Sequence, residues 1–169
     1  DSNLTACELD PRGQNLLAAF RQAFPQADLQ PARTYLLSLM IARKLLAREQ
    51  ELFDRYQLSE GKLSVLLLLR NAPGQRLSPS DLADASRVSR GTMTGLLAGL
   101  ERDGLIVREA DPRDGRRCTL HMTDSSEEII EKLLAERLQW IQSLLGGLSP
   151  DALAIQQAFL DELDAQLGE

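Results

Sequence analysis

The sequence predicts a mainly α-helical fold with one small β-hairpin, which makes it α+β in a strict sense. Helix start signals, in which Ser or Asp precedes Pro, recur from one end of the chain to the other. Near the centre, two short helical segments stand close together, and two strand-like runs follow them at once. With 169 residues, the chain has room for one domain with a sizeable core, or for a small domain with helical extensions.

Two helices are predicted before the centre of the chain. Asp10 followed by Pro11 is typical of an N-cap with Pro at the first helical position, and apolar side chains then recur at helical spacing. Pro31 begins a second, longer helix that runs to about Tyr56. Its stretch YLLSLMIARKLL is apolar on nearly every face, so we expect it to be buried on most sides. One small domain seldom buries such a helix alone, and a partner chain is its natural cover.

The central segment predicts a helix-turn-helix. One helix follows Ser59 and stops at the Pro73-Gly74 pair. A second helix begins at Ser78, which has Pro at the first position after it and Asp at the third, and it can last only about two turns. Ser89 caps the next helix, over residues 90–102. Two short helices joined by a tight turn form a helix-turn-helix.

Two strand-like runs complete this central segment. Gly104 stands where a helix C-terminal glycine belongs, the run LIVREA begins directly after it, and CTLHM alternates as its returning partner. Between the two runs, residues 111–117 (DPRDGRR) place three arginines around Gly115. A helix-turn-helix followed at once by a hairpin with a basic tip is a winged helix, so the sequence predicts a winged helix-turn-helix core.

The last third of the chain predicts two more helices. Thr123 or Asp124 caps a long one that ends at Gly146-Gly147, and Ser149-Pro150 begins the other. Amphipathic, acidic helices at both ends of the chain lie outside the winged core, so we expect them to form a dimerisation unit. The predicted domains are therefore 1–58 (an extra helix and a dimerisation helix), 59–123 (the winged helix-turn-helix) and 124–169 (C-terminal dimerisation helices).

Charge is distributed unevenly along the chain. The net charge is −6, which by itself argues against a nucleic acid as the partner. Residues 59–123, however, hold 10 Lys and Arg against 8 Asp and Glu, whereas the flanking residues hold 9 against 17. A slightly basic middle between acidic arms indicates that the middle meets an anionic partner.

The helix over residues 90–102 has one apolar face and one face of small or polar residues. We expect Met93, Leu96, Leu97 and Leu100 to belong to the core. Gly95 and Gly99 each cost roughly 1 kcal/mol of helix propensity, which close approach to a DNA groove would offset. A basic hairpin tip suits an electronegative minor groove, and Asp114 could hold Arg116 extended for it. The predicted DNA-binding residues are Ser78, Arg87, Ser89, Arg90, Gly91, Thr92, Thr94, Gly95, Arg113, Asp114, Arg116 and Arg117.

The run from LSEGKLSVLLLL through LSPSDLADASRVSRGTMTGLLAGLERDGLIVREADPRDGRRCTLHMT resembles the multiple-antibiotic-resistance regulator (MarR) family of bacterial transcription factors. The most specific parts are VSRGTMT before LERDGLI, and DPRDGRR with Thr123 after the following strand. The resemblance covers residues 59–123 closely and about 31–146 in helix order.

The resemblance implies an obligate homodimer that binds double-stranded DNA at an inverted-repeat operator and acts as a repressor. It also implies that the helix 90–102 enters the major groove and that Arg116 reaches the minor groove. Two positions depart from the family pattern. Gly95 replaces a residue that is often polar or basic, and Gly115 stands where many members carry another Arg.

A small anionic or aromatic effector is the expected regulator of DNA binding. Arg43, Lys44 and Arg48 place positive charge on or beside an otherwise apolar helix, which predicts an anion site. A solvated basic edge, or ion pairs with acidic helices of a partner subunit, explains these residues equally well.

Two other functions remain open at this stage. The overall acidity and Gly95 fit a winged-helix protein-interaction module without DNA binding. The second open function is a redox-sensing regulator, because Arg116 and Arg117 precede Cys118 and would favour its thiolate. The other cysteine, Cys7, lies near the N-terminus.

No enzymatic activity and no cofactor are predicted. The one histidine, His121, lies within a strand-like run, and the sequence contains neither a Gly-rich phosphate loop nor a cluster of metal ligands. No apolar run approaches the roughly 20 residues that a bilayer span needs, and no leader-like segment opens the chain. We therefore expect a cytoplasmic protein with two free thiols.

Overall fold

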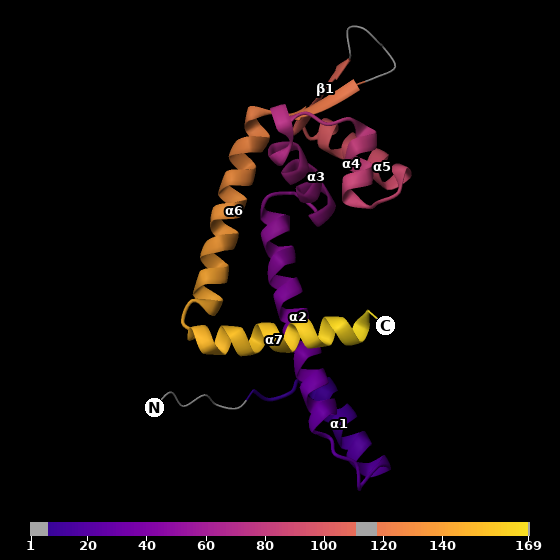
Figure 1. Cartoon of the computed structure of the whole chain (residues 1–169), viewed down its shortest axis with the longest axis vertical. Coiled ribbons are helices and arrows are strands. Elements are labelled where there is room, and N and C mark those ends of the chain that lie inside the picture. Colours follow the sequence, from indigo (N-terminus) through magenta and orange to yellow (C-terminus); the bar gives the residue numbers. More distant parts are fainter. Residues whose placement is uncertain (1–6, 111–117, 169) are drawn as a thin grey trace. The chain divides into compact units, whose positions relative to one another are not determined.

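The computed structural model describes residues 7–110 and 118–168, and the chain divides into two compact units, Asp1–Ser59 and Glu60–Glu169. Helices dominate both units, and the sheet found among the described residues has two strands (Figure 1). This arrangement confirms the predicted class, which is mainly α with one small hairpin.

The first unit consists of two helices, α1 (Pro11–Ala23) and α2 (Gln30–Arg55). Asp10 caps α1 as predicted, because its carboxylate accepts a 2.8 Å hydrogen bond from the Gly13 amide. Gly13 makes room for the buried Leu9, since a Cβ on Gly13 would lie 3.1 Å from a methyl group of that leucine. The helix α2 begins one residue before Pro31, whose ring therefore lies in the first turn.

The second unit contains the winged helix-turn-helix. Its helices α3 (Glu60–Asn71), α4 (Pro79–Ser86) and α5 (Arg90–Arg102) gather at the base of the hairpin (Figure 1). A 3-10 turn, Pro73–Gln75, follows α3 where the Pro-Gly pair predicted a stop, and Gly74 has φ +67° there. The buried core is almost entirely aliphatic and is formed by Leu63, Val65, Leu66, Leu69, Leu82, Met93, Leu97, Leu100, Leu105, Ile106 and Leu120.

The hairpin is anchored in this core at its base. Strand β1 (Ile106–Ala110) pairs antiparallel with β2 (Cys118–Met122), with Ile106 opposite Met122 and Ala110 opposite Cys118. Leu120 is fully buried and exchanges backbone hydrogen bonds with Leu77, which adds a single bridge on the other side of β2. The connection from α5 into β1 is a Schellman motif, because the Leu105 amide donates to the Leu100 carbonyl and the Gly104 amide to the Glu101 carbonyl.

Two further helices follow the hairpin, α6 (Asp124–Leu145) and α7 (Pro150–Leu167). Thr123, rather than Asp124, is the N-cap of α6. In the first half of α6, the side chains of Ile130 and Leu133 are buried, whereas α7 has no buried residue. None of the helices within residues 7–110 and 118–168 is long and apolar enough to cross a membrane.

Thr123 joins α6 to the winged core, which makes it a site for a stability test. Its hydroxyl donates a 2.9 Å hydrogen bond to the Gly104 carbonyl and accepts one from the Ser126 amide. We predict that Thr123→Val lowers the free energy of unfolding by about 1–2 kcal/mol, because the cap and the bond to Gly104 are both lost. Thr123→Ser keeps the hydroxyl and is the control. Urea unfolding at one fixed protein concentration measures both, and equal midpoints for the two variants would contradict this role.

Candidate nucleic-acid interface

The helix α5 packs against the core on one side and is open on the other. Met93, Leu97 and Leu100 are at most 1% exposed, as predicted. Leu96 is only half-buried, which corrects its expected place in the core, because its side chain lies at the edge against Gly61 of α3. The exposed residues of the helix are Arg90, Gly91, Thr92, Thr94, Gly95, Ala98 and Arg102.

The turn that leads into α5 is fixed by two N-caps. Ser78 and Asp81 form a capping box at the start of α4, and the hydrogen bonds from Ser78 lower the pKa of the Asp81 carboxyl. Arg87 ends α4 in the left-handed conformation, with φ 54°. Ser89 then caps α5 by accepting a 3.1 Å hydrogen bond from the Thr92 amide. The first turn of α5 therefore begins at the surface, where its backbone N–H groups favour an anion.

The hydroxyl groups of the predicted site already make local hydrogen bonds. The Ser89 and Thr92 hydroxyls lie 2.8 Å apart, and Thr94 donates its proton to the Arg90 carbonyl at 2.8 Å. Thr94 can therefore still accept a hydrogen bond but has no free proton to donate. Ser78 is similarly engaged, since its hydroxyl donates to the Asp81 carboxylate.

The two interior glycines of α5 have different surroundings. A Cβ added at Gly95 would meet nothing within 4 Å, whereas a Cβ at Gly99 would lie 3.1 Å from Cε of Lys62 on α3. Beyond that contact, the Lys62 ammonium pairs with the Asp103 carboxylate at 2.5 Å, and this bond lowers the pKa of Asp103. Close DNA approach was expected to account for both glycines. Packing against Lys62 explains Gly99 instead, and only Gly95 needs an external reason.

Two arginines flank the start of α5 and are exposed. Neither Arg87 nor Arg90 makes an ion pair with any residue of the described part of the chain. Both belong to the predicted site, and the helix-turn-helix brings them to the two sides of one turn. Their positive charge is thus available to a polyanion beside the N-terminus of the helix.

Ion pairs hold the base of the hairpin against the helices. Arg108 of β1 pairs with Glu101 of α5 at 2.7 Å, and Arg76 pairs with Glu109. The sequence predicted neither pair. Arg76 and Glu109 are 33 positions apart in the sequence, so no local pattern could reveal their pair. The predicted residues Arg113, Asp114, Arg116 and Arg117 lie outside the described residues.

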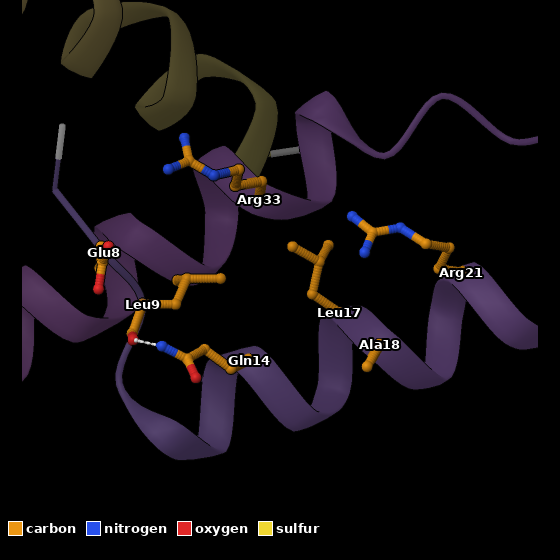
Figure 2. A pocket seen from close by; sticks show the side chains of 7 residues that line it. All are labelled: Glu8, Leu9, Gln14, Leu17, Ala18, Arg21 and Arg33. Carbon is orange, nitrogen blue, oxygen red and sulfur yellow. Dashed lines mark hydrogen bonds between the residues drawn. The ribbon is translucent and has the colours of Figure 1, made fainter.

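The three residues of the predicted anion site lie on α2, and two of them have a carboxylate of the first unit close by. Arg43 lies 3.8 Å from Asp10, Arg48 pairs with Glu51 at 2.8 Å, and Lys44 is exposed. A cavity of the same unit is lined instead by two arginines that the sequence did not single out, Arg21 and Arg33 (Figure 2).

The two cysteines and the histidine are exposed or half-buried. Cys7 is exposed, Cys118 is half-buried, and both are free, with the Arg108 guanidinium 3.9 Å from the Cys118 sulfur. His121 is half-buried in β2 opposite Val107, and no described residue makes a hydrogen bond with its Nδ1. Among the residues with described positions, no group of three or more His, Cys, Asp or Glu side chains could hold a metal ion.

Comparisons with known proteins match this architecture. Residues 56–117 match the model of the MarR family. The transcriptional repressor YetL of Bacillus subtilis is 31% identical over 130 residues, which cover 77% of this chain and 78% of YetL. The chain belongs to the MarR family.

Further MarR-family relatives agree over most of the chain. The regulator PecS of Dickeya dadantii is 25% identical over 159 residues, covering 90% of this chain and 93% of PecS. Among solved structures, the MepR chain in the crystal structure of the S. aureus MepR–DNA complex is 25% identical to this chain. The TM-score is 0.65, and the match covers 79% of this chain and 98% of MepR. The protein YusO of B. subtilis has the same identity and TM-score, and the match covers 83% of this chain and 99% of YusO. These matches confirm the winged helix-turn-helix fold and identify the chain as a transcriptional regulator, which points away from an enzyme.

The contrast between the two glycines predicts opposite effects of one added methyl group. We expect Gly95→Ala to raise the free energy of unfolding by about 1 kcal/mol, because helix propensity improves and the new Cβ meets nothing. Gly99→Ala should give no gain or a net loss, since its Cβ displaces the Lys62 side chain that reaches Asp103. Urea unfolding at matched protein concentration compares the two variants. Equal stabilisation by both would show that the contact between Gly99 and Lys62 imposes no constraint.

Proposed function

We propose that this MarR-family regulator is a homodimeric repressor that binds an inverted-repeat operator through α5 and the hairpin, and that a small-molecule effector releases it. The observation that carries the proposal is the outer face of α5. It combines small exposed residues with Arg90, and Arg87 lies across the turn that leads into the helix; neither arginine has an ion-pair partner in the described part of the chain.

The small residues suit close contact with a major groove. Gly91, Gly95 and Ala98 leave the backbone of α5 accessible along its exposed side, and the space outside Gly95 is open. A helix that lies deep in a groove can use its backbone and its short side chains against base edges. Gly95 costs helix stability, and no residue of the described part of the chain packs against it, which supports a role in binding.

The arginines suit phosphates and base edges. Arg90 lies at the first position of α5, where its side chain and the helix N-terminus attract the same anion. Arg87 lies across the turn from it. For the hairpin tip, we propose that Arg116, held by Asp114, enters the minor groove, and that Arg113 and Arg117 contact phosphates.

Apolar surface outside the winged core supports the dimer. On α7, Ile155 is 72% exposed and Phe159 and Leu163 are also exposed, while on α2 Tyr35 and Leu46 are more than half exposed. Only Leu36 and Met40 of the apolar stretch of α2 are buried within the chain. Each unit thus carries apolar surface of its own, so we propose that residues 1–58 and 124–169 pack against a second copy.

The names of relatives favour the same function. YetL is named as a repressor and MepR was solved in complex with DNA. An effector acts on such a protein only if it prefers the arrangement that binds DNA poorly, and a coupling of about 1–3 kcal/mol lowers DNA affinity about 5–150-fold.

We predict a two-fold homodimer at micromolar concentration. Sedimentation should give twice the mass of the 18.7 kDa chain. Ile155→Glu, which places a charge on the exposed apolar side of α7, should shift the equilibrium toward monomer, while Gln156→Glu is the charge-matched control on the neighbouring position. A folded monomer of the unaltered chain under these conditions would contradict the proposal.

We predict specific binding to an inverted repeat whose half-site centres lie about one helical turn apart. Fluorescence anisotropy should show that Arg90→Ala weakens binding about 5–150-fold, since a base or phosphate contact is worth about 1–3 kcal/mol. Arg116→Ala should also weaken binding. Affinity should fall steeply with salt, and the slope should decrease where a phosphate contact is lost.

The control for this experiment removes the same charge elsewhere. Arg12 is exposed on α1, and Arg12→Ala should leave operator affinity and the dimer unchanged. If Arg90→Ala binds as tightly as Arg12→Ala, α5 is not the contact. If the unaltered chain shows no preference for any duplex taken from upstream of its gene, a protein-interaction module becomes the better account.

A further inference from the structure

The hydroxyl group of Thr94 has a fixed polarity. Thr94 is exposed on α5, and its Oγ1 donates a 2.8 Å hydrogen bond to the Arg90 carbonyl one turn earlier. A carbonyl oxygen can only accept, so the single hydroxyl proton of Thr94 is committed to this bond. The Ser89 and Thr92 hydroxyls differ, because they lie 2.8 Å apart and either of them can be the donor. Thr94 therefore presents lone pairs, and no proton, to a partner that approaches α5.

Small neighbours allow a partner to come close to the Thr94 oxygen. Gly91 and Ala98 lie about one turn before and after Thr94 on the exposed side of the helix, and Gly95 is next to it. A Cβ added at Gly95 would meet nothing within 4 Å. A threonine side chain is short, so its oxygen can contact a base edge only where the helix backbone lies deep in the groove. The small residues around Thr94 permit that depth.

An oxygen that can only accept divides the four bases into two classes. On the major-groove edge, adenine carries an N6 amino donor and cytosine an N4 amino donor, whereas guanine and thymine present the O6 and O4 acceptors. The Thr94 oxygen can accept a hydrogen bond from an amino group, but it meets a keto oxygen lone pair to lone pair. A keto base could be bound only if the hydroxyl proton left the Arg90 carbonyl, which breaks the bond that holds it.

We propose that Thr94 selects an amino base, adenine or cytosine, against a keto base at one position of each operator half-site. The inference rests on the proposed function, because it requires α5 to lie in the major groove. Four helical residues rise about 6 Å and successive base pairs lie about 3.4 Å apart, so the position is expected within about two base pairs of the one that Arg90 contacts. Exchange of A for C is then tolerated there, while exchange of A for T or of C for G is not.

The first experiment is in vitro selection from a random duplex library with the unaltered chain and two variants. Thr94→Val keeps the size and the methyl group and removes the oxygen, whereas Thr94→Ser keeps the oxygen and removes the methyl group. We expect the unaltered chain to bind the amino base about 3–10-fold more tightly than the keto base, as one hydrogen bond implies. Thr94→Val should lose this preference at that position alone, and Thr94→Ser should retain it. Urea unfolding checks that both variants are folded.

The second experiment removes the amino group from the DNA. A selected adenine is replaced by unsubstituted purine, and a selected cytosine by 2-pyrimidinone, in the duplex that the unaltered chain prefers. Fluorescence anisotropy should show about 3–10-fold weaker binding by the unaltered chain. Thr94→Val should lose nothing further, because it already lacks the acceptor, and a change in the duplex itself affects both proteins equally.

The outcomes separate this inference from the proposed function. An amino preference that Thr94→Val loses and Thr94→Ser retains supports the inference. A preference for thymine alone that persists in Thr94→Val overturns it, because the methyl group then reads the base. A keto preference, or identical selection by the unaltered chain and Thr94→Val, also overturns it while the proposed function stands. If the unaltered chain enriches no sequence at all, the proposed function fails and the inference fails with it.

Discussion

The close crossing of α3 and α5 is the constraint on which the rest of the winged core depends. Each helix offers a glycine to the other, since Leu96 of α5 lies against Gly61 and Lys62 of α3 lies against Gly99. A larger residue at either glycine would push the helices apart or displace the side chain opposite. Because interiors are close-packed, such a shift would spread to the leucines beneath, and α5 would change its position in the core.

The remaining contacts hold α5 at both ends and leave its outer face unused. Ser89 fixes the N-terminus, while the Lys62–Asp103 and Arg108–Glu101 pairs fix the C-terminal half and join it to the hairpin. These pairs are partly exposed, so each contributes only modest stability. Their value is positional, because they orient a helix whose exposed residues are available to a partner. A rigid helix loses little freedom on binding, which preserves affinity.

Most of the fold is predictable from local sequence signals. The tertiary contacts are not, because they join residues that lie far apart in the sequence. Asp10, Ser78, Ser89 and Ser149 act as caps where the sequence placed them, because capping depends on residues within one turn. Gly99 was assigned to DNA approach, since nothing in its neighbourhood of the sequence shows that Lys62 packs on it. The arginines of the cavity were missed for the same reason. Arg21 and Arg33 lie on different helices, and only the fold brings them to one space.

The composition of α5 makes the dimer necessary for the proposed mode of DNA binding. Few of its exposed side chains can read a base edge, since Gly91, Gly95 and Ala98 carry no polar side-chain group and Thr94 can only accept. Of the predicted contacts on the helix, Arg90 and Thr92 are then the ones that we propose as direct readers in each half-site, beside the acceptor Thr94. One good bidentate contact discriminates by about 1–3 kcal/mol, whereas specific recognition needs about 4–10 kcal/mol over non-specific DNA. Two half-sites and the hairpins have to act together, so the spacing of the two α5 helices sets the affinity. In the proposed dimer, whatever changes how the two chains pack therefore controls DNA binding without touching α5.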